Sequence, residues 1–197
     1  MHKEILYDDV FDAQQHYRLL LDCMARPGKI NMMPEMELMM PEGIHAAGAL
    51  VAFALLNADV SFYVEGEAAY EVGRYLLVNT SARPEASGEA DYIFLDGSAP
   101  SELLRQLKVG TLPYPEEGAT VIAAVEGLAN EGEGLALGLS GPGVPGDRVL
   151  CVRGVERAFF DVLAEINGEF PLGIDVILTG KDRRVTCIPR STKIRVG

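Results

Sequence analysis

Apolar side chains recur at intervals of three and four positions in several segments, the pattern of a helix with one buried face. Helices are expected over residues 13–26, 43–57, 67–77, 99–109 and 155–166. Asp12 is the expected N-cap of the first helix, and Pro27 and Gly28 end it. Ser98 and Pro100 are expected to open the fourth helix. The second helix is apolar on nearly every side, so we expect it to be buried.

Short apolar runs between these helices predict strands. Strands are expected over residues 60–64, 92–95, 119–125, 135–139 and 149–152, with a C-terminal hairpin over residues 172–188. The Gly- and Glu-rich residues 126–134 are expected to join the strands on either side of them as a hairpin. The pattern therefore predicts an α/β protein: a single domain, residues 1–197, with a mixed, largely antiparallel sheet flanked by helices.

A carboxylate interrupts the apolar pattern of the C-terminal hairpin. Strand alternation places Asp175 on a face where a charge needs a partner. A two-residue or four-residue loop between the strands would place Ile188 opposite Asp175, with Arg190 diagonally beside it. A three-residue loop would shift the register by one and send Arg190 to the opposite face. The hairpin register therefore decides whether Asp175 and Arg190 meet.

Two interpretations of Asp175 and Arg190 are open. They are either a structural ion pair that closes the hairpin, or part of a substrate or anion site in which Arg190 is the donor. Ion-pair networks also create such clusters, and isolated buried charges are rarely tolerated. The structural interpretation is therefore favoured.

The Gly- and Pro-rich residues 141–146 follow a predicted strand and are a second candidate anion site. Backbone amides near Gly141 and Gly143 would form the cradle for a phosphate. The two prolines of this loop lack amide hydrogens, and no Gly-Lys-Ser/Thr sequence follows, so a tight turn is favoured. Arg18 lies off the apolar stripe of its helix, which favours a solvated or interface position. No catalytic constellation stands out, so the residues alone do not support an enzyme.

Composition narrows the class of partner. The chain has 197 residues, of which 48% are hydrophobic, and a net charge of −12 with a pI near 4.7. This acidity argues against nucleic acid and against an anionic membrane as partners. The cysteines and histidines have no metal-ligand spacing, so we expect no metal. They are Cys23, Cys151, Cys187, His2, His16 and His45. The first residues are acidic and the longest apolar run is short, which predicts a cytoplasmic protein without a secretory signal.

Several short motifs follow one another along nearly the whole chain. They are Tyr17-Arg18-Leu19-Leu20, Met24-Ala-Arg-Pro-Gly28, Gly110-Thr111, Pro115-Glu116, Gly118-Ala-Thr120, Gly141-Pro-Gly143, Phe170-Pro-Leu-Gly-Ile-Asp175 and Ile188-Pro-Arg-Ser-Thr192. In this order and spacing they resemble the H subunit of the carbon-phosphorus lyase system of bacterial phosphonate metabolism. Ser191 stands where that family usually has a threonine, which keeps the hydroxyl group.

The resemblance implies a cytoplasmic accessory subunit that is a homodimer by itself and joins the G, I and J subunits in a core complex. That system transfers the ribose triphosphate part of ATP to an alkylphosphonate, as a ribose 1-methylphosphonate 5-triphosphate synthase. The family fold is similar to pyridoxal-phosphate-dependent transferases but without a functional cofactor site, so no cofactor is expected. The resemblance carries over no catalytic residue. The alternative is a stand-alone nucleotide-binding or phosphonate-binding enzyme that uses Arg190, Arg18 and the loop over residues 141–146.

Overall fold

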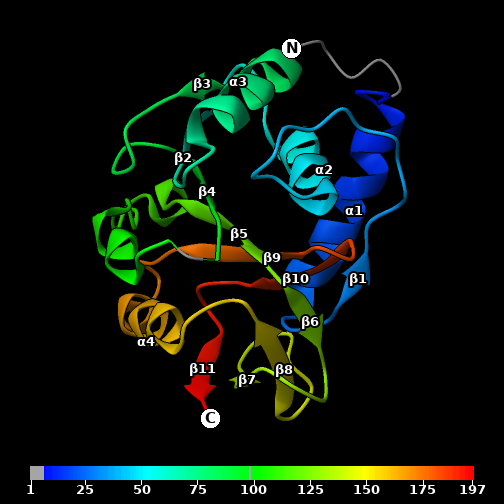
Figure 1. Cartoon of the computed structure of the whole chain (residues 1–197). Coiled ribbons are helices and arrows are strands. Elements are labelled where there is room, and N and C mark those ends of the chain that lie inside the picture. The colour runs from blue at the N-terminus through cyan, green and yellow to red at the C-terminus, as the bar shows by residue number, and fades with distance from the viewer. Residues whose placement is uncertain (1–6, 98) are drawn as a thin grey trace.

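A seven-stranded sheet runs through the middle of the molecule in the order β1-β10-β9-β5-β4-β2-β3 (Figure 1). The computed structural model describes residues 7–97 and 99–197, so His2 and Ser98 of the sequence interpretation lie outside the described residues. The strands of this large sheet are β1 (Asn31–Met32), β2 (Ser61–Val64), β3 (Arg83–Pro84), β4 (Tyr92–Leu95), β5 (Thr120–Val125), β9 (Asp175–Gly180) and β10 (Arg184–Ile188).

Five neighbouring strands of the large sheet are parallel. β9, β5, β4, β2 and β3 share one direction, and β10 runs against them. β1 is antiparallel to β10 and therefore has the direction of the parallel strands. The mixed α/β class is confirmed, but the expectation of a largely antiparallel sheet is wrong for this sheet. Parallel neighbours need long crossovers. The chain supplies them with the helix α3 (Ala69–Thr80), the 3₁₀ helix η1 (Ser101–Gln106) and the long segment between β5 and β9.

The long segment between β5 and β9 contains most of a second, antiparallel sheet. Its strand order is β11-β7-β8-β6. These strands are β6 (Gly127–Ala129), β7 (Leu135–Ser140), β8 (Arg148–Arg153) and the C-terminal β11 (Lys193–Val196). The predicted hairpin between residues 119–125 and 135–139 is wrong, because β5 belongs to the large sheet while β7 pairs with β8 and β11.

The remaining helices are α1 (Phe11–Ala25), α2 (Ala46–Leu55), α4 (Arg157–Ile166), η2 (Pro115–Glu117) and η3 (Asn167–Glu169). The segment after Pro100 forms the short η1 rather than the expected α-helix. Asp8, rather than Asp12, accepts the free amides at the start of α1, from Val10 and Phe11 at 2.8 Å each. The Asp12 carboxylate instead accepts the amide of Asp8 at 2.9 Å. The two carboxylates therefore complete one cap between them.

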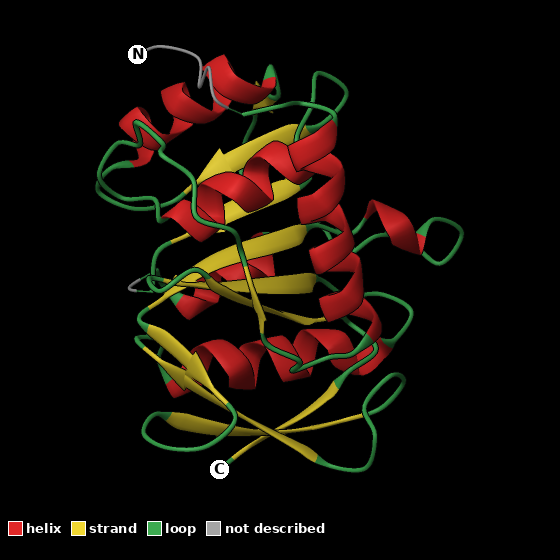
Figure 2. Cartoon of the chain, turned by 90° about the vertical axis from the view of Figure 1, so that its right-hand side faces the viewer, coloured by secondary structure: helices red, strands yellow, loops and turns green. Residues whose placement is uncertain are grey.

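The large sheet is buried on both faces. On one face, α1, α2 and α3 pack against side chains such as Phe62 and Ile177. On the other face, α4, η1 and the second sheet pack against side chains such as Val121 and Val176. Figure 2 shows helices flanking the large sheet and the second sheet forming the end of the molecule near the C-terminus. Burial on both faces explains why β4 and β5 are continuous apolar runs, with no polar face to alternate with.

Among the described residues, no helix combines the length and apolar character that a membrane crossing requires. The three cysteines are free thiols, and all three are buried. Cys23 of α1 and Cys187 of β10 lie in the core between the helix and the sheet. The Cys23 and Cys187 side chains therefore serve as packing groups of the core.

His16 is a buried titratable group in the same core. Its side chain lies on α1 and is fully buried, with Nδ1 3.3 Å from the Tyr7 hydroxyl and Nε2 without a partner. Burial lowers the pKa of His16, because a charged imidazolium would lose its hydration there. The pKa of His45, at the start of α2, is lowered by burial and by the nearby Lys181.

We expect the free energy of unfolding to decrease as the pH falls below about 6.5, the pKa of an unfolded histidine. The unfolded chain then binds protons that the folded chain excludes from His16 and His45. Denaturant unfolding at about pH 7.5 and about pH 5.5 measures this loss. A His16→Gln/His45→Gln protein should lose less stability over that interval than the parent. An equal loss in both proteins would contradict the assignment.

Candidate functional site

Asp175 and Arg190 form an ion pair at the amino-terminal edge of the parallel strands. The Asp175 carboxylate accepts hydrogen bonds from the Arg190 backbone amide at 2.8 Å, from Nη2 at 2.7 Å and from Nε at 3.2 and 3.3 Å. The side chains are 13% exposed for Arg190 and 23% for Asp175. The predicted pairing is therefore confirmed, in a site largely shielded from water.

The hairpin register is not the one that would place Ile188 opposite Asp175. Ile188 lies opposite Val176, and a three-residue loop, residues 181–183, joins the strands. Arg190 still reaches Asp175 because β10 ends at Ile188. Residues 189–192 then form a turn, which is closed by a hydrogen bond of 2.8 Å from the Thr192 amide to the Pro189 carbonyl oxygen. Strand alternation therefore no longer decides where the Arg190 side chain points.

The same guanidinium also binds the loop that contains η2. Its Nη1 donates to the carbonyl oxygen of Pro115, and its Nη2 lies 3.5 Å from that of Gly118. Arg190 thus joins four of the sequence motifs: its own, the one that ends at Asp175, and the two that begin at Pro115 and Gly118. We call this group of contacts around Arg190 and Asp175 the clasp.

Two glycines make room for the clasp. A Cβ on Gly118 would lie 2.6 Å from Nη1 of Arg190, and a Cβ on Gly173 would lie 2.3 Å from Oδ1 of Asn167. Gly173 also has φ +142°, which a residue with a side chain rarely adopts. Asn167 needs that space because its amide pairs with both the N–H and the C=O of Ile174, at 2.9 and 3.0 Å. The glycines of these motifs are therefore required by close approach.

The arrangement leaves little of Arg190 for a ligand. A guanidinium has five N–H donors on three nitrogens. All three nitrogens already donate to Asp175, Pro115 or Gly118. The geometry therefore favours the structural interpretation of this pair over an anion site.

A second carboxylate that the sequence interpretation missed acts in the same way at the same edge. Asp91 accepts hydrogen bonds from the amide and the hydroxyl of Ser61, both at 2.8 Å, and pairs with Lys108. Lys108 in turn accepts the Ala119 amide through its carbonyl oxygen, at 2.8 Å. A polar residue directly before the apolar run of β4 was the available signal. Its partners Ser61 and Lys108 are distant in sequence, so the sequence could not predict the pairing itself.

The other candidate residues take no part in the hydrogen bonds of the clasp, although Gly141 lies next to it: a Cβ there would be 3.0 Å from the carbonyl oxygen of Ser191. Arg18 is exposed on α1. Gly141 and Gly143 have positive φ, and a hydrogen bond from the Val144 amide to the Gly141 carbonyl closes a tight turn. A Cβ on Gly143 would lie 2.2 Å from the carbonyl oxygen of Ala25. The tight-turn interpretation is therefore confirmed, with the turn packed against the end of α1.

Hollows line the opposite, carboxyl-terminal edge of the parallel strands, where open α/β sheets usually bind ligands. Two of them, of about 470 and 770 Å³, share Gly43 and Asp96. Strand order changes direction between β2 and β4, and Glu65 and Asp96 come directly after these two strands. Recognising the strands as parallel would have pointed to these positions from the sequence.

The charge of these hollows limits what they could hold. Six carboxylates line the two together, against the cationic Lys181 and His45, whose pKa is lowered by burial. They are Glu42, Glu65, Glu67, Asp96, Glu126 and Glu156. So many carboxylates would repel the phosphates of a nucleotide. Within residues 7–97 and 99–197, no group of three or more His, Cys, Asp or Glu side chains could hold a metal ion.

The fold and the clasp define a class: a mixed α/β protein in which a partly buried ion pair ties surface loops to the edge of a parallel sheet. Residues 5–195 match the family described as Bacterial phosphonate metabolism protein (PhnH), so the chain belongs to this family, and the resemblance seen in the motifs is confirmed.

Two relatives have names that describe their roles. The chain is 31% identical over 189 residues to the Alpha-D-ribose 1-methylphosphonate 5-triphosphate synthase subunit PhnH of Rhizobium meliloti (strain 1021), covering 95% of this chain and 92% of that protein. It is 28% identical over 183 residues to HtxG of Stutzerimonas stutzeri, whose name describes a candidate C-P lyase subunit, covering 93% of this chain and 86% of that protein. Both similarities extend over nearly the full length of this chain.

Replacing Asp175 with Ala should lower the free energy of unfolding by roughly 3 kcal/mol, because Arg190 then keeps a partly buried charge without a counter-charge. Urea unfolding measures the loss. An Asp175→Ala/Arg190→Met protein should lose less than the sum of the two single variants. Asp161→Ala, in the exposed pair with Arg157, is the control and should change stability little. Strictly additive losses at Asp175 and Arg190 would contradict a coupled pair.

Proposed function

We propose that this chain is an accessory, non-catalytic subunit of the carbon-phosphorus lyase system. In that role it is required for transfer of the ribose triphosphate part of ATP to an alkylphosphonate during phosphonate catabolism. Membership of the phosphonate metabolism family supports the proposal. So does the name of the Rhizobium meliloti relative, which is a subunit of a ribose 1-methylphosphonate 5-triphosphate synthase.

One structural observation carries the accessory role. Several of the motifs that carry the resemblance meet at the clasp, where Arg190 and Asp175 bind each other and the backbone, and Asn167 binds the backbone beside them. Residues arranged in this way hold loops in a fixed shape. A fixed loop surface is what a subunit offers to its partners, whereas a catalyst needs groups free to contact the substrate.

The proposal includes a cellular setting and partners. The chain, acting as a single domain over residues 1–197, would work in the cytoplasm with the G, I and J subunits of the system, and would form a homodimer by itself. A fold related to pyridoxal-phosphate-dependent transferases, without their cofactor, belongs to the same proposal. Lys29 and Lys108 are each held in an ion pair with a carboxylate, so neither amine is free to form a Schiff base with such a cofactor.

A reconstituted mixture of the G, I and J subunits with this chain should convert ATP and methylphosphonate and release adenine, and omission of this chain should abolish the conversion. The isolated chain should show no conversion, because it is proposed to contribute structure. Adenine release followed by chromatography provides the measurement. Adenine release by the isolated chain, or by the mixture without it, would reject the accessory role.

One face of α1 supports the homodimer. Val10, just before α1, is followed at helical spacing by Tyr17 and Leu21. The side chain of Val10 is 69% exposed, that of Tyr17 45% and that of Leu21 49%. Exposed apolar side chains that share one helix face are typical of protein interfaces. Met32, on the edge strand β1 of the large sheet, is also half exposed, at 51%.

Leu21→Arg should convert the dimer into a monomer in sedimentation experiments, because a charge at the centre of an apolar interface loses its hydration. Leu112→Arg is the matched control: Leu112 is 75% exposed in the loop before η2, and its replacement should leave the dimer intact. A dimer that survives Leu21→Arg would exclude this face of α1 as the interface.

A further inference from the structure

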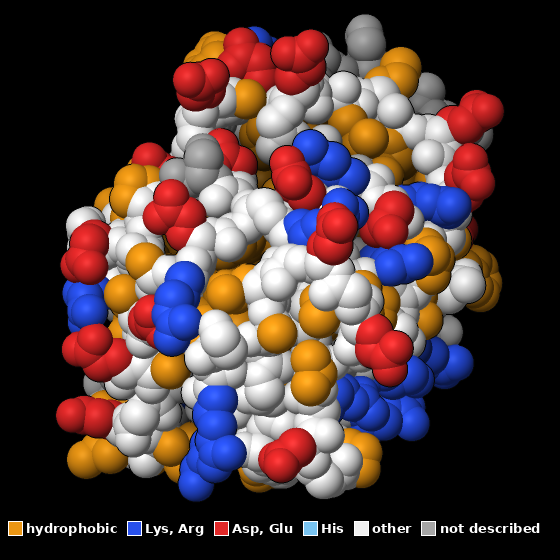
Figure 3. All heavy atoms as spheres, turned by 60° about the horizontal axis from the view of Figure 1, so that its bottom comes forward, with side chains coloured by type: hydrophobic (Ala, Val, Ile, Leu, Met, Phe, Trp, Pro, Cys, Tyr) orange, Lys and Arg blue, Asp and Glu red, His pale blue; other side chains and the backbone are white. Residues whose placement is uncertain are grey.

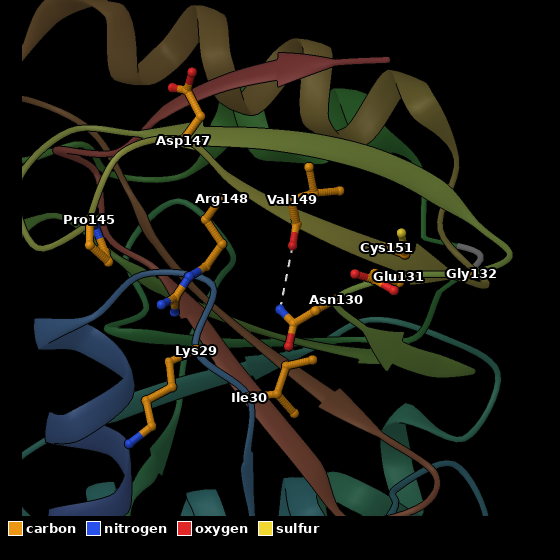
Figure 4. A pocket seen from close by; sticks show the side chains of 10 residues that line it. All are labelled: Lys29, Ile30, Asn130, Glu131, Gly132, Pro145, Asp147, Arg148, Val149 and Cys151. Carbon is orange, nitrogen blue, oxygen red and sulfur yellow. Dashed lines mark hydrogen bonds between the residues drawn. The ribbon is translucent and has the colours of Figure 1, made fainter.

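A hollow of about 750 Å³ opens between the end of α1 and the second sheet (Figure 4). Lys29 and Ile30, which follow α1, form one wall. The loop after β6, residues 130–132, and the segment leading into β8 form the others. The volume is in the range of sites that hold small molecules. The site is separate from the clasp and from the acidic hollows at the carboxyl-terminal edge.

Arg148 brings a positive charge into this hollow. It is the first residue of β8, and Figure 4 shows its side chain reaching from that strand toward the chain segment that holds Lys29. Within residues 7–97 and 99–197, the side chain of Arg148 has neither a hydrogen bond nor an ion pair, although its backbone belongs to the β7–β8 pairing. Its guanidinium therefore retains the planar set of donors that suits phosphate oxygens.

A glycine of the family motif Met24-Ala-Arg-Pro-Gly28 makes this placement possible. A Cβ on Gly28 would lie 3.1 Å from Cδ of Arg148 and 2.7 Å from Cδ1 of Leu139. Gly28 also has φ +74°, which glycine adopts without strain. The stem of Arg148 thus packs over the bare backbone at Gly28, and this contact directs the side chain toward Lys29.

Lys29 supplies a second positive charge with a fixed position. Its Nζ lies 2.5 Å from Oδ2 of Asp22, which also accepts a hydrogen bond from Nδ2 of Asn31 at 2.8 Å. Asp22 pairs with Arg26 as well. Two cations share this one carboxylate, so the end of α1 keeps a net positive charge, and Figure 4 shows the Lys29 amine directed away from Arg148 toward the helix.

The carboxylates of the hollow lie away from its basic end. Figure 4 shows Asp147 pointing away from Lys29, and Glu131 beside Cys151 at the other end of the cavity. Asn130, whose Nδ2 lies 3.4 Å from the carbonyl oxygen of Val149, faces the basic end. Elsewhere charges are mixed: Figure 3 shows acidic and basic side chains interspersed over the lower face of the molecule. The basic end of the hollow is therefore a local feature of an acidic protein.

We propose that the hollow between Lys29 and Arg148 binds a phosphate or phosphonate group of a small-molecule anion. Arg148 donates to the oxyanion, and the net positive charge that Lys29 and Arg26 leave at the end of α1 attracts it from the neighbouring wall. The inference rests on the proposed function, in which the chain works beside an oligophosphate and a phosphonate, and assigns those ligands a place on this subunit.

Isothermal titration of the full chain with tripolyphosphate, and separately with methylphosphonate, tests the inference. At least one of the two should bind, and Arg148→Gln should weaken that binding by roughly tenfold or more, as expected for loss of a charge-assisted hydrogen bond. Lys29→Gln should weaken it in the same direction and provides a second variant should Arg148→Gln fail to fold. Arg105→Gln, which removes one exposed positive charge elsewhere, should bind as the parent does.

Three results would overturn the inference: no binding of either anion, parental affinity in both cavity variants, or an equal loss in Arg105→Gln. The last would indicate general attraction of anions to positive charge. Reconstitution with the G, I and J subunits separates this inference from the proposed function. Should the parent chain support adenine release but bind neither anion, only the cavity assignment fails. A failed reconstitution with intact anion binding would reject the accessory role instead.

Discussion

The guanidinium of Arg190 lies where three segments distant in the sequence meet at the amino-terminal edge of the large sheet. It binds the Asp175 carboxylate at the start of β9 and two carbonyl oxygens of the loop around η2. A partly buried charge of this kind is stable only when its partners stay in place. The segments around it therefore share one constraint, and it is met by glycines that leave no side chain between them and by the paired amide of Asn167.

The two edges of the parallel strands differ in the work they can do. At the amino-terminal edge, Asp175 and Asp91 each bind a basic side chain from a neighbouring loop, so loops and sheet form one rigid unit. At the carboxyl-terminal edge are hollows whose charged side chains are mostly carboxylates. The hollow beside the end of α1, with its Arg148 guanidinium, is a third region, built where the second sheet meets the helix. Rigid loops, an acidic edge and a basic hollow suit a subunit that presents several different surfaces.

Prediction from the sequence succeeded where local pattern and burial agree. The apolar stripes of α1, α3 and α4 and the apolar run of β4 identified these elements, because one buried face requires that periodicity. Prediction failed where a distant contact decides the outcome. The sheet was predicted to be largely antiparallel because an apolar run in the sequence does not indicate which strand it pairs with, or in which direction. β7 was paired with β5 because the two are close in sequence, whereas the fold pairs it with β8 and β11.

By itself, the sequence determined the α/β class, the family, and the need of Asp175 for a positive partner, because these follow from periodicity, motif order and the desolvation of a charge. The tertiary structure decided how that need is met. The register places Ile188 opposite Val176, and Arg190 reaches Asp175 only because the strand ends before it. The approach of Arg148 to Lys29 was likewise invisible in the sequence, since it depends on how β8 packs over Gly28, 120 positions earlier (148 − 28).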